Sequence, residues 1–214
     1  MRTSSADKLA QVDVVIFDCD GVLVDTRASY DRAIEVTLAH FLANIFGLKL
    51  NATFLAEQLV EALRGTGQYN NDIDATAAIL VSITANLPSA EVVKGLQSLG
   101  VAATGLQNTF DSEGFANRTL TLTDMASQGL SSFVDKVKAK VPNLALCIDG
   151  LLERLAYPGG PASSSLTRVF DEYYYGPALL KQLHGIDSVI GCKTGLIDSE
   201  SVLASKETLR SQGM

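Results

Sequence analysis

The amino-acid sequence predicts an α/β protein in which most of the chain is α-helical. Residues 12–17, Val-Asp-Val-Val-Ile-Phe, form a near-continuous apolar run that is rich in β-branched residues, with Asp13 as its one polar residue. Such a run is typical of a strand buried on both faces in a parallel sheet. From about residue 29 to residue 184, apolar residues instead recur at the spacing of amphipathic helices. We therefore expect the first strand and its loop at residues 1–27 and a helical domain at residues 28–204, with residues 205–214 as a third part.

The helical part divides into successive segments. The first helix has one apolar face, made of Ile34, Leu38, Phe41, Leu42 and Ile45, and Gly47 follows as a stop. Further helices are predicted at residues 55–65, 75–87, 89–99 and 131–140. Residues 64–74 are polar and are expected to form a loop between two of these helices. The apolar stripe at residues 166–184 contains Gly176-Pro177, which is expected to divide it into two helices.

Composition narrows the classes of function. The chain of 214 residues carries 17 basic and 24 acidic residues, a net charge of −7, which argues against binding to nucleic acid or to an anionic membrane. Three widely spaced cysteines frame neither a disulfide scaffold nor a zinc site and fit a reducing compartment. There is no apolar stretch of about eighteen residues, the length that a membrane span needs. We therefore expect a soluble, cytoplasmic protein.

Two carboxylates, Asp18 and Asp20, follow the predicted strand directly, and Gly21 lets the chain turn sharply. Parallel sheets form ligand sites at the carboxyl ends of their strands. Two carboxylates so close together favour a hard cation such as Mg²⁺, which also takes oxygen atoms of a substrate phosphate. One carboxylate can attack phosphorus while the other transfers protons. The alternatives are a turn with no catalytic role and the D-x-D metal motif of a nucleotide-sugar glycosyltransferase.

Residues 14–25, Val-Val-Ile-Phe-Asp-Cys-Asp-Gly-Val-Leu-Val-Asp, resemble the first signature motif of the haloacid dehalogenase (HAD) superfamily. The resemblance implies a Rossmann-like core with a helical cap inserted after this motif. It also implies that Asp18 is the nucleophile and a Mg²⁺ ligand, and that Asp20 is the general acid and base and a second ligand. Because the dehalogenases of this superfamily lack the second aspartate, Asp20 favours phosphate chemistry on a small phosphorylated metabolite.

A second resemblance concerns the expected cap. Residues 63–74 and 170–185 are similar to cap segments of subfamily IA phosphatases related to phosphoglycolate phosphatase, some of which carry an aromatic-Asn-Asn-Asp-Trp-Asp sequence where this chain has Tyr69-Asn70-Asn71-Asp72-Ile73-Asp74. One interpretation is a substrate-selecting loop that contributes Arg64, Asn70, Asn71 and Asp72, with Arg64 as an anion contact. The other is a solvated loop whose Asn and Asp residues cap the next helix.

The resemblance implies that residues 205–214 begin the return from the cap to the core. It also implies elements that this sequence does not supply. A HAD phosphatase needs a Ser or Thr after its second core strand, a Lys, and a later acidic pair. Residues 144–150 contain a single Asp, so we do not interpret them as the acidic strand. We expect the 214 residues to be the N-terminal part of a phosphatase, or of a phosphomutase, and to lack measurable activity alone. The alternative is a catalytically inactive helical interaction or remnant module.

Overall fold

The computed structural model describes residues 24–48, 52–87, 119, 126–199 and 201–202. The chain divides into two compact units, one made of Met1–Arg27 and Glu200–Met214, and the other of Ala28–Ser199. In the first unit, β1 (Val24–Asp25) pairs antiparallel with β2 (Ser201–Val202), with Val24 opposite Val202. The predicted strand at residues 12–17, the helix at 89–99 and residues 205–214 lie outside the described residues. The α/β assignment therefore stays a prediction.

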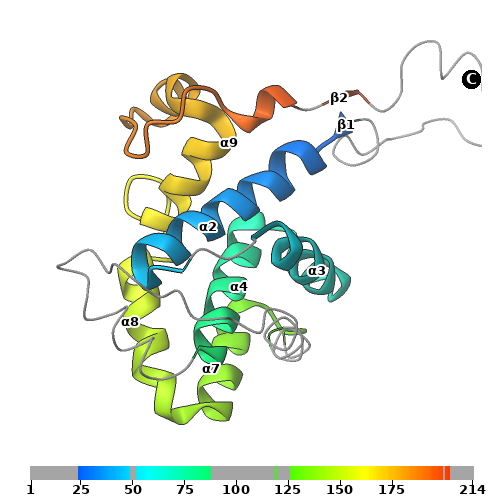
Figure 1. Ribbon diagram of the computed structural model, residues 1–214, viewed down its shortest axis with the longest axis vertical. Helices are drawn as coiled ribbons and strands as arrows, with labels where there is room; N and C mark the ends of the chain where they lie inside the picture. Colours follow the sequence, from blue (N-terminus) through cyan, green and yellow to red (C-terminus); the bar gives the residue numbers. More distant parts are fainter. Residues whose placement is uncertain (1–23, 49–51, 88–118, 120–125, 200, 203–214) are drawn as a thin grey trace, which may run out of the picture. The chain divides into compact units, whose positions relative to one another are not determined.

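The described part of the second unit is mostly helical, which confirms the helical character predicted for these residues (Figure 1). It contains, in order, a π-helical turn η1 (Arg27–Asp31, whose first residue belongs to the other unit), α2 (Arg32–Phe46), α3 (Ala52–Gly65), α4 (Asp72–Asn86), α7 (Leu130–Lys140), a 3₁₀ turn η2 (Pro142–Leu144), α8 (Ala145–Leu155), α9 (Ser165–His184) and a 3₁₀ turn η3 (Leu196–Ser199). Among these described helices, none has the length and apolar character needed to cross a membrane.

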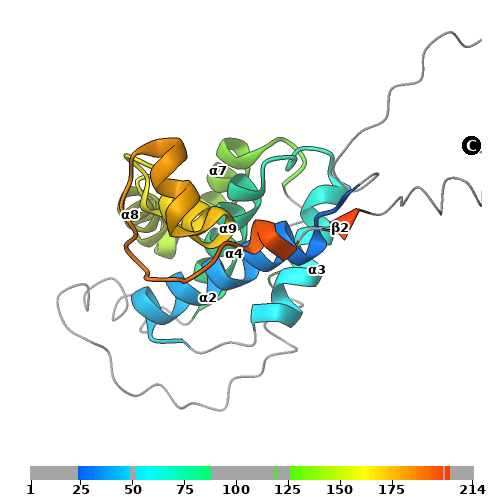
Figure 2. The same cartoon turned by 90° about the horizontal axis from the view of Figure 1, so that it is seen from above.

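Helix α4 lies in the middle of this unit and contacts α2, α3, α7, α8 and α9 (Figures 1 and 2). Residues 75–85 of α4 are all buried, as expected for a helix whose whole circumference is apolar or small. Its buried hydroxyl groups do not lack partners, because Thr76, Ser82 and Thr84 each donate to the carbonyl oxygen four residues earlier, at 2.7–2.8 Å. The central helix can therefore be enclosed without leaving these hydroxyls unsatisfied.

The first helices agree closely with the sequence pattern. In α2, the predicted apolar face is buried, and Gly47 ends the helix in the left-handed conformation. Helix α3 ends at Gly65 as predicted. The polar loop is shorter than residues 64–74, because α4 already begins at Asp72. The reason is that acidic residues are favourable in the first turn of a helix, so Asp72 and Asp74 belong to α4 despite their polarity.

The later helices also follow the sequence. Helix α7 covers the predicted segment at residues 131–140, and residues 144–150 lie in η2 and α8 rather than in a strand. Helix α9 is interrupted at Gly176, whose φ of 76° and ψ of 165° are not helical. The break predicted from Gly176-Pro177 is thus confirmed, and the chain makes two helical halves that meet at this residue.

Candidate functional site

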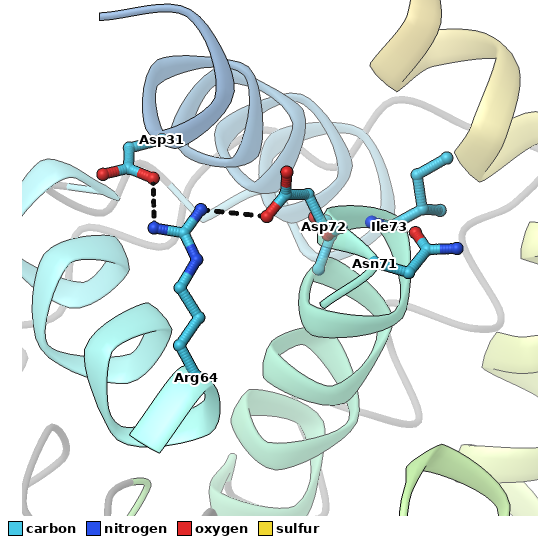
Figure 3. Close-up of polar contacts among 6 residues, drawn as sticks. Asp31, Arg64, Asn71, Asp72 and Ile73 are labelled. Carbon is cyan, nitrogen blue, oxygen red and sulfur yellow. Dashed lines mark hydrogen bonds and ion pairs between the residues drawn. The ribbon is translucent and has the colours of Figure 1, made fainter. Parts of the chain in front are cut away.

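A polar cluster centred on Arg64 lies where α3 ends and α4 begins (Figure 3). Arg64 lies in the last turn of α3, Asp31 at the end of η1, and Asp72 is the first residue of α4. The Arg64 guanidinium is 2.7 Å from Asp31 Oδ1 through Nη1 and 2.9 Å from Asp72 Oδ1 through Nη2. The Arg64 side chain, at the end of α3, therefore connects this helix to the starts of α2 and α4.

Electrostatics favours this arrangement. Carboxylates are stabilised at helix N-termini and a cation at a helix C-terminus, which is where Asp72 and Arg64 lie. Partial burial disfavours the charge of Arg64, but the hydrogen bond from Arg64 to Asp72 and the charges of Asp31 and Asp72 outweigh it and raise the pKa of the guanidinium. The side chain of Arg64 is still 40% exposed. An external anion that bound Arg64 would compete with two carboxylates already in contact.

The two asparagines of the loop differ in their contacts. Asn71 is the N-cap of α4, and its Oδ1 accepts a hydrogen bond from the Ile73 backbone N–H at 2.9 Å (Figure 3). This is the helix-capping role that the sequence left open beside a substrate-binding role. Asn70 is exposed. The structure thus brings together Arg64 and Asp72, turns Asn71 to the backbone of its own helix, and leaves Asn70 at the surface.

The aromatic and acidic ends of the same motif also contribute to packing. Tyr69 is 1% exposed, and its burial, with the nearby Asp74 charge, raises its pKa to about 12. Asp74 accepts a hydrogen bond of 2.6 Å from the hydroxyl of Tyr157, in the loop after α8. Burial, that hydrogen bond and the Asp74 charge raise the pKa of Tyr157. Residues 69–74 therefore connect α3, α4 and the loop after α8.

The predicted catalytic pair, Asp18 and Asp20, lies outside the described residues. Within the described ranges, no group of three or more His, Cys, Asp or Glu side chains could hold a metal ion. Two carboxylates one residue apart are a donor set that suits a hard cation such as Mg²⁺. The assignment of the nucleophile and of the metal ligands to Asp18 and Asp20 therefore stays a prediction.

A second polar site, which the sequence pattern did not indicate, surrounds Glu172 of α9. Its carboxylate accepts hydrogen bonds from the Ser188 hydroxyl and from the backbone N–H groups of Val189, Ile190 and Gly191. The residue is 0% exposed. Burial raises the pKa of such a group, but these hydrogen bonds outweigh it and lower the pKa of Glu172. In the sequence, the signal for this site is a charged residue among apolar and aromatic positions of the predicted helix at residues 166–184.

Two further titratable groups lie in the helices near this site. Asp171 is 9% exposed, and burial raises the pKa of its carboxyl to about 6, although the nearby His184 acts in the opposite direction. His40 of α2 packs edge-on against Phe41 and Tyr173, with ring centroids 5.2 Å and 6.2 Å away. Burial lowers the pKa of His40, and the charge of Glu172 raises it in part. These contacts give His40 a packing role between α2 and α9.

Comparisons with known proteins add no family to these observations. No protein-family model, curated protein or solved structure matches the chain.

Proposed function

We propose that this chain belongs to a Mg²⁺-dependent phosphohydrolase of the HAD superfamily that acts on a small phosphomonoester. The observation that carries the proposal is the near-continuous apolar run at residues 12–17, whose last four residues are all apolar, followed at once by Asp18-Cys19-Asp20-Gly21. This pattern combines a buried strand with two carboxylates at its end and a glycine that lets the backbone come close to a ligand. The helical unit that begins at Ala28 supports the proposal, because a helical cap inserted after this motif is what the resemblance implies.

In the proposed reaction, Asp18 is the nucleophile. Its carboxylate oxygen forms a bond to phosphorus as the bond from phosphorus to the substrate alcohol oxygen breaks, and Asp20 gives its proton to that leaving oxygen. Asp20 then takes a proton from water, which attacks phosphorus, releases inorganic phosphate and restores the Asp18 carboxylate. When bound, Mg²⁺ would supply positive charge that offsets the repulsion between these carboxylates and the phosphate.

The helical unit is proposed to act as the cap that limits access to this centre. The net charge of −7 and the composition favour a small phosphorylated metabolite in the cytoplasm over a nucleic-acid or membrane partner. Arg64 and Asp72 would reach such a substrate only through exchange of the contacts described above, whereas Asn70 is already exposed. We therefore assign Arg64 mainly to holding the cap together.

The proposal is tested with the protein expressed from its complete reading frame. We expect hydrolysis of an aryl phosphate that requires Mg²⁺ and is abolished by a chelator. Asp18→Asn is expected to lower kcat by at least about a thousandfold, because it removes the nucleophile. The matched control is Cys19→Ser, between the two aspartates, which is expected to keep most of the activity. Full activity in the Asp18→Asn protein would show that the nucleophile is assigned wrongly.

A second candidate is a catalytically inactive helical interaction module. It is favoured by one observation: the residues that resemble a cap motif, 69–74, already make contacts within the helical unit. Asn71 caps α4, Asp72 pairs with Arg64, and Asp74 accepts a hydrogen bond from the Tyr157 hydroxyl. If the complete protein neither binds Mg²⁺ nor hydrolyses any member of a panel of phosphomonoesters, this second candidate replaces the first.

A further inference from the structure

Both ends of the helical unit pack against the same short stretch of α9, residues 172–176. The incoming segment (residues 28–31) precedes α2, and the return segment (residues 185–199) follows α9. Figure 2 shows the return segment, in orange, running back along α9 to η3, and η3 contacts α9. These are the segments through which the helical unit continues into the other unit of the chain.

The return segment is attached through Glu172. Its carboxylate accepts from the backbone N–H groups of Val189 at 2.8 Å, Ile190 at 3.1 Å and Gly191 at 3.1 Å, and from the Ser188 hydroxyl. Such charge-assisted hydrogen bonds are stronger than neutral ones, and they satisfy three consecutive backbone donors of the segment at once. Loss of the Glu172 charge would leave this part of the return segment without its main attachment.

The same segment also covers the end of the first half of α9. The last carbonyl groups of a helix lack intrahelical partners, and here the Cys192 thiol donates to the Glu172 carbonyl oxygen at 3.2 Å. A few residues later Gly195 approaches so closely that a Cβ atom on it would lie 2.2 Å from the Tyr175 carbonyl carbon. The order of this last turn before Gly176 therefore depends on the return segment.

The incoming segment contacts the next residues of that turn. Tyr30 stacks on Tyr174, with ring centroids 4.5 Å apart and an angle of 23° between the planes. Tyr174 is 5% exposed, and Ser29 beside Tyr30 is fully buried. On its other side the segment is held by the ion pair between Asp31 and Arg64. Glu172 and Tyr174, two residues apart in one helical turn, thus hold opposite ends of the unit.

We propose that residues 172–176 of α9 are a shared anchor that couples the incoming and return segments, so that loosening one segment loosens the other. The physical reason is that the last turn before Gly176 is ordered from both sides. Tyr174 can stack on Tyr30 only while that helical turn is formed. The turn is itself stabilised by the contacts between Glu172 and residues 188–195. The coupling concerns the helical unit alone and does not depend on the proposed phosphatase activity.

Hydrogen exchange of the full chain, followed by mass spectrometry, tests the coupling. In Glu172→Gln, we expect protection to fall about tenfold or more in peptides covering residues 188–192, the factor expected from losing hydrogen bonds to a charged group. The decisive result is that protection also falls in peptides covering residues 28–33, while protection in α7 and α8 does not change. The matched control is Glu153→Gln on the exposed surface of α8, which should alter neither segment.

The reverse experiment uses the incoming segment. Tyr174→Leu removes the stacking partner of Tyr30, and we expect it to lower protection at residues 188–192 as well as at residues 28–33. Phe133→Leu, which changes another buried aromatic residue, in α7, controls for a general loss of stability. If Glu172→Gln does not fold, Ser188→Ala removes one of the same hydrogen bonds more mildly. Exchange that rises only in the segment directly altered would overturn the proposal.

Discussion

Asn70 and Asn71 have the same side chain, but only Asn71 caps α4. Replacing an N-cap asparagine with alanine leaves the first helical N–H groups without that acceptor, so Asn71→Ala is expected to lower the free energy of unfolding by about 1 kcal/mol. Asn70→Ala, at an exposed position, is expected to change it by less than about 0.5 kcal/mol. Urea denaturation of the two variants measures the difference. Equal losses in both would show that capping does not explain the role of Asn71.

Asp171 is expected to make stability depend on pH. Because burial raises the pKa of its carboxyl from 3.8 to about 6, the folded protein binds this proton more tightly than the unfolded chain does. Ionisation of Asp171 therefore costs stability above pH 6, and the cost disappears as the pH falls below 3.8. Asp171→Asn is expected to raise Tm at about pH 7.5, with a gain that shrinks steadily toward about pH 4.

The control for this comparison is Asp135→Asn on α7. The side chain of Asp135 is 74% exposed and lies 3.9 Å from Lys138, a distance at which a surface ion pair contributes little. Thermal unfolding of both variants across the pH range is the measurement. A gain in Tm from Asp171→Asn that does not vary with pH would mean that the buried charge is not its cause.

At the scale of the helix, the interruption of α9 depends on Gly176. With φ of 76°, and with a Cβ that would lie 2.4 Å from the Gly195 backbone nitrogen, Gly176→Ala is expected to lower the free energy of unfolding by at least about 2 kcal/mol. Gly150 provides the opposite control, since it lies inside α8 with no atom within 4 Å of an added Cβ. Gly150→Ala should raise stability by about 0.5–1 kcal/mol.

Chemical denaturation of the two glycine variants decides this point. The expected result is a change of opposite sign for the same chemical substitution, because only Gly176 has a backbone conformation and a neighbour that exclude a side chain. A harmless Gly176→Ala variant would show that α9 tolerates a continuous helix and that the close contact with Gly195 is not required.

The helices were largely predictable because their apolar spacing is a local property of the sequence. The buried face of α2, its stop at Gly47 and the break at Gly176 all follow from periodicity and from the backbone preferences of glycine and proline. Helix α4 begins at Asp72, before residue 75 where the apolar pattern predicts its start, because the helix dipole favours Asp72 and Asp74 in a first turn despite their polarity. Polarity alone therefore misplaced a helix boundary.

The polar contacts were less predictable than the helices. Arg64 was singled out as an anion contact, but its partners, Asp31 and Asp72, are brought to it by the packing of α2, α3 and α4. The hydrogen bonds that Glu172 accepts from backbone N–H groups 17–19 residues later leave no periodic signal in the sequence. Contacts of this kind depend on tertiary structure. Residue types can therefore indicate which side chains form polar contacts, but not which residues they contact.

For the whole molecule, the proposed chemistry and the described helical unit concern different parts of the chain. The catalytic proposal rests on Asp18 and Asp20, which follow the predicted strand, whereas the contacts of Arg64, Asn71 and Glu172 account for how the helical unit is held together. A cap that selects substrate must keep its own shape while its ends connect to the core. The shared anchor on α9 is suited to that requirement, since it holds the incoming and return segments together.

The most direct test of the proposed function is to trap the covalent intermediate. The protein expressed from its complete reading frame is mixed with Mg²⁺ and an aryl phosphate, quenched in acid during turnover, digested, and analysed by mass spectrometry. We predict a phosphoryl group on Asp18, present in the Cys19→Ser protein and absent in the Asp18→Asn protein. Hydrolysis that continues with Asp18 unmodified, or that persists in the Asp18→Asn protein, would contradict the assignment of Asp18 as the nucleophile.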